Sequence, residues 1–252
     1  MYRPRIIPVL LLKGEGLYKS VKFKNFNYIG DPINAVKLFN DLKADELTFL
    51  DINATKEKRI ISLDLIKDIG EEANMPFAVG GGIKSIKDIE QIIKAGAEKV
   101  VINTHAIKNP YFIKEASDYF GSSTISVCID VKKNLFGKQK IHSNAGAKLS
   151  SHKILDFCKL MEQNGAGELI IQSVDKDGTM EGYDIILLAS VSKHVTIPVV
   201  GLGGAKSLKN LKKAYDLCNL NGLAAGSLFV YQGTKKGVLI NYPERNEVRF
   251  TS

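Results

Sequence analysis

Eight short apolar runs recur along the chain, and a longer amphipathic segment separates most of them from the next. The runs are IIPVLLL, ELTFLDI, PFAVGGG, KVVINT, STISVCID, ELIIQSV, IPVVGLGG and GLAAGSL. Runs of this length are typical of fully buried strands, and intervening helices favour parallel pairing. No long linker or composition break interrupts the alternation. We therefore predict an α/β fold, a single (β/α)8 TIM barrel that forms one domain over residues 1–252.

The chain also repeats itself at about half its length. The segment from Ala78, AVGGGIKSIKDIEQIIKAGAEKVVINT, is similar to the segment from Val199, VVGLGGAKSLKNLKKAYDLCNLNGLAAGS. RIIPVLLLK likewise matches TISVCIDVKK, which aligns Leu11 with Asp130. A two-fold half-barrel repeat would set these two positions opposite each other across the barrel mouth. The sequence thus supplies one carboxylate where the symmetry predicts two.

Composition and charge exclude several classes of protein. The net charge of +8 comes from lysines scattered through helix-like segments, without a basic motif interleaved with aromatic residues, so we expect no nucleic-acid partner. The three cysteines are far apart, which favours a reduced, cytoplasmic protein without disulfides. No signal peptide or membrane-length apolar run is present, and we expect no membrane association. The histidines show no ligand spacing, and we assign no metal, no cofactor and no role to His105, His142, His152 and His194.

Two symmetry-related groups of residues at strand ends are candidates for phosphate binding. Glycine-containing loops there can present backbone N–H groups to an anion, and a pair of them indicates a substrate with a phosphate at each end. Alternatively, the glycines only permit tight strand-to-helix turns. The groups are Gly80–Gly82 with Asn103 and Thr104, and Gly203 and Gly204 with Gly226 and Ser227. Tyr18 and Lys19 follow the first strand in a predicted loop, which we expect to act as a lid over substrate.

Carboxylates at two other strand ends are candidates for catalysis and binding. Asp130 ends an apolar strand, where partial desolvation would raise its pKa and suit it to proton transfer. The alternative is a structural ion pair with Lys132. Asp175 and Asp177 lie in SVDKDGT, where they could orient substrate hydroxyls or simply form Asx turns before Gly178.

Four charged residues precede apolar strand cores at the opposite end of the predicted barrel. They come from the first, second, fourth and sixth strands: Arg5, Glu46, Lys99 and Glu168. Charges at this end usually cap the core as a salt-bridge network. The other interpretation is a gate to a passage through the barrel.

Over essentially its whole length, the chain resembles the cyclase subunit of imidazole glycerol phosphate synthase, a (β/α)8 barrel. The matching stretches are RIIP, GDPINAVKLFND, ADELTFLDI, VGGGI, AGAEKVVINT, FGSSTISVCID, DKDGT followed by GYD, and IPVVGLGGA. In that family a glutaminase subunit docks on the N-terminal face of the barrel and releases ammonia. The ammonia passes a charged gate and the barrel interior, and meets a bisphosphate substrate that is cleaved and cyclised. The resemblance therefore implies a glutaminase partner and a small phosphorylated substrate.

The resemblance also implies roles for particular residues. It assigns the gate to Arg5, Glu46, Lys99 and Glu168, phosphate contacts to Gly82, Asn103, Thr104, Asp177, Gly178 and Gly204, a lid lysine to Lys19, and general acid/base catalysis to Asp130. The family's other catalytic aspartate falls on Leu11, which cannot transfer protons. Gln172 and Leu202 stand where the family usually has small hydroxyl residues.

An intact gate beside an altered catalytic end leaves three hypotheses. The first is a barrel that delivers ammonia to a different acceptor. It is similar to a branch of the family in which this barrel, a glutaminase and a separate ATP-dependent amidotransferase convert an acetamido group of a surface-polysaccharide sugar to an acetamidino group. The second is a histidine-pathway cyclase that tolerates Leu11. The third is a non-catalytic scaffold or activator of the glutaminase.

Overall fold

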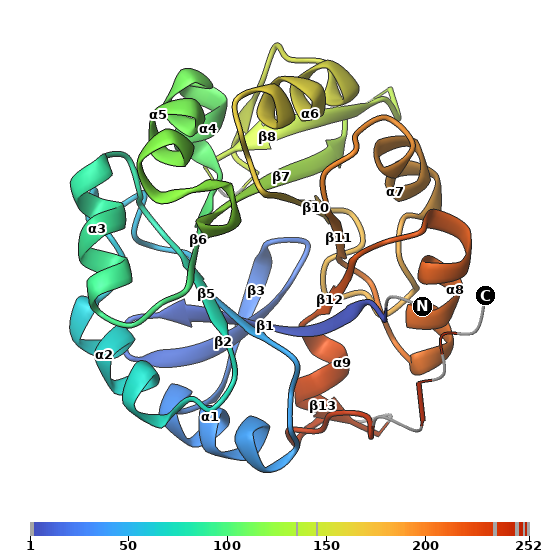
Figure 1. Ribbon diagram of the computed structural model, residues 1–252. Coiled ribbons are helices and arrows are strands. Elements are labelled where there is room, and N and C mark those ends of the chain that lie inside the picture. Colours follow the sequence, from blue (N-terminus) through green and yellow to red (C-terminus); the bar gives the residue numbers. More distant parts are fainter. Residues whose placement is uncertain are drawn as a thin grey trace.

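The computed structural model describes residues 3–134, 136–144, 146–233, 236–244, 247–248 and 250. Within them, eight parallel strands close into a barrel that a ring of helices surrounds (Figure 1). In order around the barrel the strands are β1 (Arg5–Lys13), β4 (Leu47–Asp51), β5 (Phe77–Gly80), β6 (Lys99–Ile102), β7 (Ile125–Lys133), β10 (Glu168–Ser173), β11 (Val199–Leu202) and β12 (Gly222–Ala225). β12 pairs with β1 and closes the ring. The predicted TIM barrel is confirmed, and each apolar run overlaps one of its strands.

Helices connect the barrel strands and bury their apolar sides against them. They are α1 (Pro32–Asp41), α2 (Leu63–Glu72), α3 (Ile86–Lys94), α4 (Thr104–Lys108), α5 (Tyr111–Phe120), α6 (Ile154–Gln163), α7 (Ile185–Ser192), α8 (Leu208–Cys218) and α9 (Ser227–Val230), with a short 3₁₀ helix η1 (Ser122–Thr124). At α1 the Asp31 carboxylate accepts the N–H of Asn34 at 2.8 Å, and Pro32 lies in the first turn. Both residues favour a helix start at this point.

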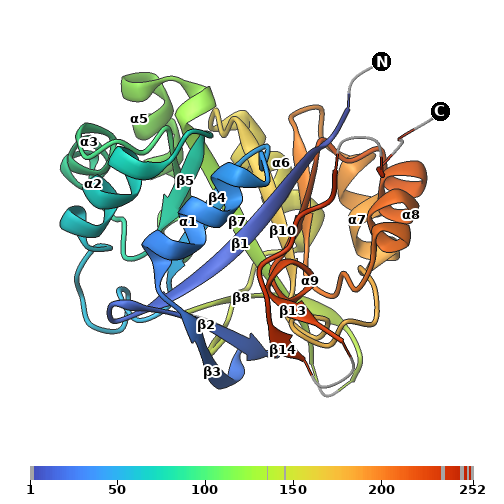
Figure 2. The same ribbon diagram turned by 90° about the horizontal axis from the view of Figure 1, so that it is seen from below.

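Six strands that the apolar pattern did not predict lie outside the barrel in the described residues, and they form three antiparallel pairs among themselves. The pairs are β2 (Gly16–Val21) with β3 (Lys24–Gly30), β8 (Gln139–Ser143) with β9 (Lys148–Leu149), and β13 (Tyr231–Gln232) with β14 (Gly237–Val238). Figure 2 shows them at the carboxyl end of the barrel strands, away from the end where β1 begins. The expectation that Tyr18 and Lys19 lie in a loop is wrong, because β2 pairs with β1 on one side and with β3 on the other.

The half-barrel repeat is visible in strand pairing. β1 and β7 are four barrel strands apart, and each continues into an antiparallel strand. Leu11 pairs with Leu50 on the neighbouring barrel strand, and Asp130 pairs with Gln172 in the same way. Leu11 and Asp130 therefore occupy equivalent positions in the two halves, as the sequence repeat predicts.

The core has two layers. The larger layer lies between the strands and the helices, and a smaller apolar cluster fills the lumen of the barrel. The lumen cluster consists of Ile7, Val9, Ala78, Val101, Cys128, Ile170, Val200, Leu202 and Ala224, with Leu11 and Leu50 partly buried against it. A packed lumen is usual for this fold. None of the helices in the described ranges combines the length and apolar character needed to cross a membrane.

Candidate functional site

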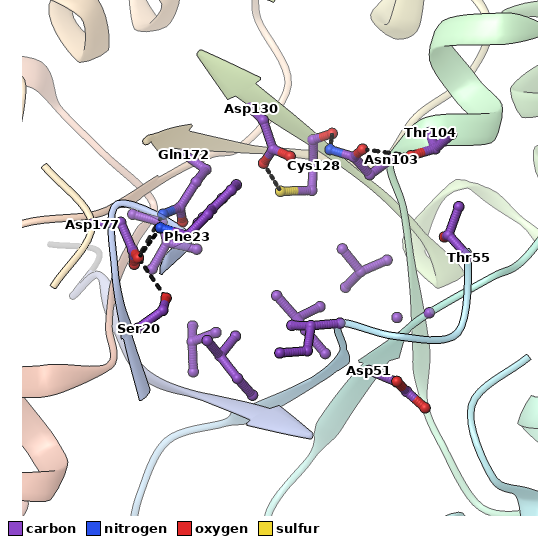
Figure 3. A pocket seen from close by; sticks show the side chains of 18 of the residues that line it. Ser20, Phe23, Asp51, Thr55, Asn103, Thr104, Cys128, Asp130, Gln172 and Asp177 are labelled. Carbon is purple, nitrogen blue, oxygen red and sulfur yellow. Dashed lines mark hydrogen bonds between the residues drawn. The ribbon is translucent and has the colours of Figure 1, made fainter. Parts of the chain in front are cut away.

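A cavity of about 730 Å³ opens at the carboxyl end of the barrel strands (Figure 3). Cavities of this size are typical of small-molecule binding sites. Most of the residues that the sequence assigned to catalysis or substrate binding in the mouth line this cavity: Lys19, Gly82, Asn103, Thr104, Asp130, Asp177, Gly178, Gly204 and Ser227. Two further candidates, Asp175 and Tyr18, are not among its lining residues. Residues that are far apart in the sequence thus line the same cavity.

The two predicted phosphate-binding groups lie where β5 and β6 end and where β11 and β12 end. For two glycines at the cavity, one in the first group and one in the loop after β10, backbone packing explains why the residue is glycine. Gly82 has a φ of +73°, and a Cβ there would lie 1.8 Å from the carbonyl oxygen of Arg59. A Cβ on Gly178 would lie 2.0 Å from the carbonyl oxygen of Ser20. Close backbone packing alone therefore requires glycine at both positions, and any phosphate role depends on their place beside the cavity.

Asp130 points into the cavity from β7 (Figure 3) and is 6% exposed. The Cys128 thiol donates to its Oδ1 at 3.8 Å, while the Asn103 Nδ2 donates to the Cys128 carbonyl oxygen at 2.9 Å. Burial raises the pKa of Asp130 to about 7. Hydrogen bonds with Asn103 and Cys128 lower this pKa and so oppose the effect of burial, whereas the negative charge of Asp177 raises it further. Within the described residues Asp130 has no ion pair, so the alternative of a structural pair with Lys132 is wrong. A carboxyl with this pKa can give or take a proton near neutral pH.

The position equivalent to Asp130 in the other half-barrel is apolar. Leu11 lines the cavity together with Leu50 and Leu202, and its side chain packs on the lumen cluster. The cavity therefore has one side that cannot ionise, opposite the β7 side that carries Asp130.

Lys19 lies on β2 but turns inward, and only 4% of it is exposed. Its Nζ donates to the carbonyl oxygen of Val9 at 3.2 Å, at the upper end of the lumen. Burial lowers the pKa of Lys19, and the nearby charge of Asp177 offsets part of this shift.

Asp177 holds the β2–β3 hairpin over one side of the cavity. Its Oδ2 accepts hydrogen bonds from the Ser20 hydroxyl at 2.8 Å and the Phe23 N–H at 3.4 Å. Gln172 donates to its Oδ1 at 3.4 Å, and the Lys22 N–H donates to its backbone carbonyl at 2.9 Å. The carboxylate is thus engaged with the hairpin (Figure 3), which leaves the neighbouring backbone as the part of this loop suited to a phosphate.

Asp51 is a buried carboxylate at the cavity that the sequence reasoning missed. It ends the apolar strand β4 as Asp130 ends its own run, and this was the signal that could have identified it. Arg59 donates to its Oδ2 at 2.5 Å, and the N–H groups of Asn53 and Ala54 donate to its Oδ1. Asp51 is therefore neutralised, and it shapes the loop after β4.

Basic side chains on the cavity rim were missed as well. They are Lys56, Lys58, His105 and Lys108. Burial, followed by the charge of Lys108, lowers the pKa of His105. Each belongs to a loop or short helix after a barrel strand, so only the fold brings them together. In the described part of the chain, no group of three His, Cys, Asp or Glu side chains is placed to hold a metal ion.

The four predicted gate residues form one partly buried network at the other end of the lumen, in which Glu46 and Glu168 are the buried members. The Arg5 guanidinium donates to the carboxylates of both Glu46 and Glu168, and the Lys99 Nζ lies 3.0 Å from Glu46 Oε2. Ser126 donates to Glu168 Oε1 at 3.2 Å. Burial disfavours the charge of Arg5, but the two carboxylates outweigh it and raise its pKa. The network lies where β1, β6 and β10 begin, and it caps the core as one interpretation predicts. That it also acts as a gate stays a prediction.

Comparisons with known proteins agree with this arrangement. The protein family described as histidine biosynthesis protein matches residues 5–236. A protein of Leptospira interrogans provisionally named imidazole glycerol phosphate synthase subunit HisF is 43% identical over 248 residues, which cover 98% of each chain. The provisionally named subunit hisF3 of Vibrio vulnificus is 43% identical over 98% of this chain and 95% of its own. The imidazole glycerol phosphate synthase subunit HisF of Streptococcus sanguinis is 36% identical over 92% of each chain.

The family match runs from Arg5 to beyond the last barrel strand, and it includes every site residue described above. The chain belongs to the HisF-like family of imidazole glycerol phosphate synthase cyclase subunits.

Proposed function

We propose that this barrel receives ammonia from a glutaminase docked on its N-terminal face and conducts it to a phosphate-bearing acceptor in the carboxyl-end cavity. One observation carries the proposal: a partly buried charge network lies at one end of an apolar lumen, and a cavity with a titratable carboxyl lies at the other end.

The lumen suits neutral ammonia. Its lining is apolar, so an ammonium ion would lose its hydration without compensation, whereas uncharged ammonia would lose much less. Arg5 bridges both carboxylates of the gate, and entry would require it to release at least one of them. Ammonia would thus enter the lumen only through a rearrangement that a docked glutaminase could trigger.

The cavity suits an anionic acceptor. The basic residues of its rim would attract phosphate groups, and the strand-end loops on two sides offer backbone donors. Asp130 would supply proton transfer to the acceptor. The activity would be that of an ammonia-dependent synthase of the lyase type, with the barrel as one subunit.

We infer that the acceptor differs from the usual cyclase substrate because Leu11 removes one of two catalytic carboxylates. The acceptor we favour is an acetamido sugar that becomes an acetamidino sugar for a surface polysaccharide, with a separate ATP-dependent amidotransferase as a further partner. The second candidate is the histidine-pathway cyclase itself, which the family match and the Streptococcus relative favour. A scaffold or activator of the glutaminase is the third.

A cyclase assay on the purified barrel tests these functions. The histidine-pathway bisphosphate is supplied with excess ammonium salt at mildly alkaline pH, which bypasses any glutaminase. Turnover of about 1 s⁻¹ or more would establish the cyclase and overturn the altered-acceptor proposal. Absence of turnover, with a bisphosphate analogue still bound, supports an altered acceptor. With a glutaminase partner, unchanged product formation in Asp130→Asn would instead support the scaffold.

A further inference from the structure

Only two buried titratable side chains among the described cavity residues are free to exchange protons with a ligand. Asp51 is paired with Arg59, and Asp177 is bonded to the β2–β3 hairpin. The rim residues Lys56, Lys58 and Lys108 are exposed, and His105 is half-buried beside Lys108. Burial keeps the Cys128 thiol protonated by raising its pKa. Asp130 and Lys19 are what remains.

We propose that Lys19 is a catalytic residue, the second proton-transfer group of this cavity, and that it acts opposite Asp130 on a phosphorylated carbonyl acceptor. This inference rests on the proposed function, in which ammonia reaches this cavity.

The placement of Lys19 supports the role. Its Nζ bonds to the carbonyl oxygen of Val9, two residues before Leu11 on β1. A Cβ on Gly226 would lie 1.8 Å from the same Nζ, so the missing side chain of Gly226 makes room for the amine between β1 and β12. β1 and β7 face each other across the ring of eight strands. The amine thus lies on the side of Leu11, and Asp130 projects from the other side.

The two groups suit the addition of ammonia to a carbonyl carbon. The nitrogen lone pair forms the C–N bond, and the C=O π electrons move to oxygen, which gives an N–H₃⁺ group and an alkoxide. Lys19 as free amine takes one proton from that nitrogen and becomes ammonium. Asp130 in its acid form gives its proton to the alkoxide and becomes carboxylate. The product is a neutral carbinolamine, and the enzyme is left with one positive and one negative charge. A ketone, an aldehyde and an amide share this step.

The free amine is favoured by its surroundings. Burial lowers the pKa of Lys19, and the charged groups that face it are Asp177, which opposes this shift, and Asp130 across the cavity. The bond to Val9 uses an N–H group and leaves the nitrogen lone pair available.

A phosphate-bearing aldehyde tests the proposal without glutaminase, ammonia or acceptor. Pyridoxal 5′-phosphate forms an imine with an unprotonated amine, and borohydride fixes the adduct for peptide mapping. At about pH 7.5 we expect Lys19 to be modified at least tenfold faster than exposed lysines, because a lysine amine in water, with an ordinary pKa of about 10.4, is almost fully protonated at this pH. Glycerol phosphate should protect it. Lys19→Arg should abolish this adduct, and the matched variant Lys13→Arg, at an exposed position near the same hairpin, should retain it.

Modification that spreads over Lys56, Lys58 and Lys108 while Lys19 stays unmodified would overturn the proposal. Equal rates at Lys19 and at exposed lysines would do the same. Because the readout needs no ammonia transfer, it stays decisive if the glutaminase does not couple to this barrel. Loss of coupling would instead appear in the stoichiometry of glutamate and product, and would count against the proposed function alone.

Discussion

Burial sets both the chemistry of Asp130 and its cost to the fold. The carboxyl is 6% exposed, and burial raises its pKa from 3.8 to about 7. The folded protein thus binds this proton more tightly than the unfolded chain does. The free energy of unfolding therefore falls as the pH rises from about 4 to about 7, and it stays lower above that range. A pKa shift of one unit corresponds to about 1.4 kcal/mol, so the fold with Asp130 ionised is less stable than the fold with Asp130 protonated by on the order of 4 kcal/mol.

The substitution Asp130→Asn removes this charge and nearly preserves the shape of the side chain. At about pH 8 we expect the variant to be more stable than the unaltered protein by roughly 2–4 kcal/mol, and near pH 4.5 by about 1 kcal/mol or less. Urea unfolding at both pH values, with the slope m checked for constancy, measures the difference. Product formation should fall by about 10²–10⁴-fold in the same variant.

A matched variant on a neighbouring loop separates this effect from a general loss of charge. The Asp175 carboxylate accepts the N–H of Lys133 at 2.7 Å and is half-buried at the surface. Asp175→Asn should not stabilise the protein at either pH. If Asp130→Asn destabilises the fold at both pH values, or stabilises it equally at both, then Asp130 is not held against a desolvation cost and the reasoning fails.

Other substitutions test the gate, the altered catalytic position and the hairpin. Arg5→Ala leaves the buried Glu168 without its cation, so glutamine hydrolysis should exceed product formation; equal amounts of glutamate and product would refute the gate. Leu11→Asp should raise turnover of the histidine-pathway bisphosphate by orders of magnitude in a latent cyclase and very little in a reshaped cavity, as followed by substrate absorbance. Ser20→Ala removes the 2.8 Å bond to Asp177, worth about 1.5 kcal/mol, so amide exchange in the β2–β3 hairpin should accelerate roughly tenfold; unchanged exchange would show that this bond does not hold the hairpin.

The barrel was predictable because its strands are buried on both faces and read as continuous apolar runs. The β2–β3 hairpin gives no such signal. β3 is mostly exposed, and the buried face of β2 includes Lys19 and Ser20, which hydrophobic periodicity does not mark as interior. Its position depends on Asp177, a residue far along the chain.

The site was predictable to the extent that strand ends mark it. Asp130 could be identified because a single carboxylate ends an apolar run. Asp51 has the same pattern, yet its neutralisation by Arg59 could not be deduced from sequence, since it depends on the path of the following loop. The inward orientation of Lys19 depends on the missing side chain of Gly226, and no local sequence pattern near either residue predicts that the two lie in contact.

Buried charged groups are paired at one end of the lumen and unpaired at the other, and this difference suggests a role for Leu11. At the end where β1 begins, Glu46 and Glu168 each have a cationic partner, so the charges compensate one another. At the cavity Asp130 and Lys19 lie buried without an ion pair in the described part of the chain, and both have pKa values that burial moves toward neutral pH. A carboxylate in place of Leu11 would add a negative charge on the side of Lys19 and hold that amine protonated. An apolar residue at position 11 adds no such charge and leaves the Lys19 amine unprotonated. The replacement of the family's aspartate by Leu11 would therefore allow Lys19 to act as a base.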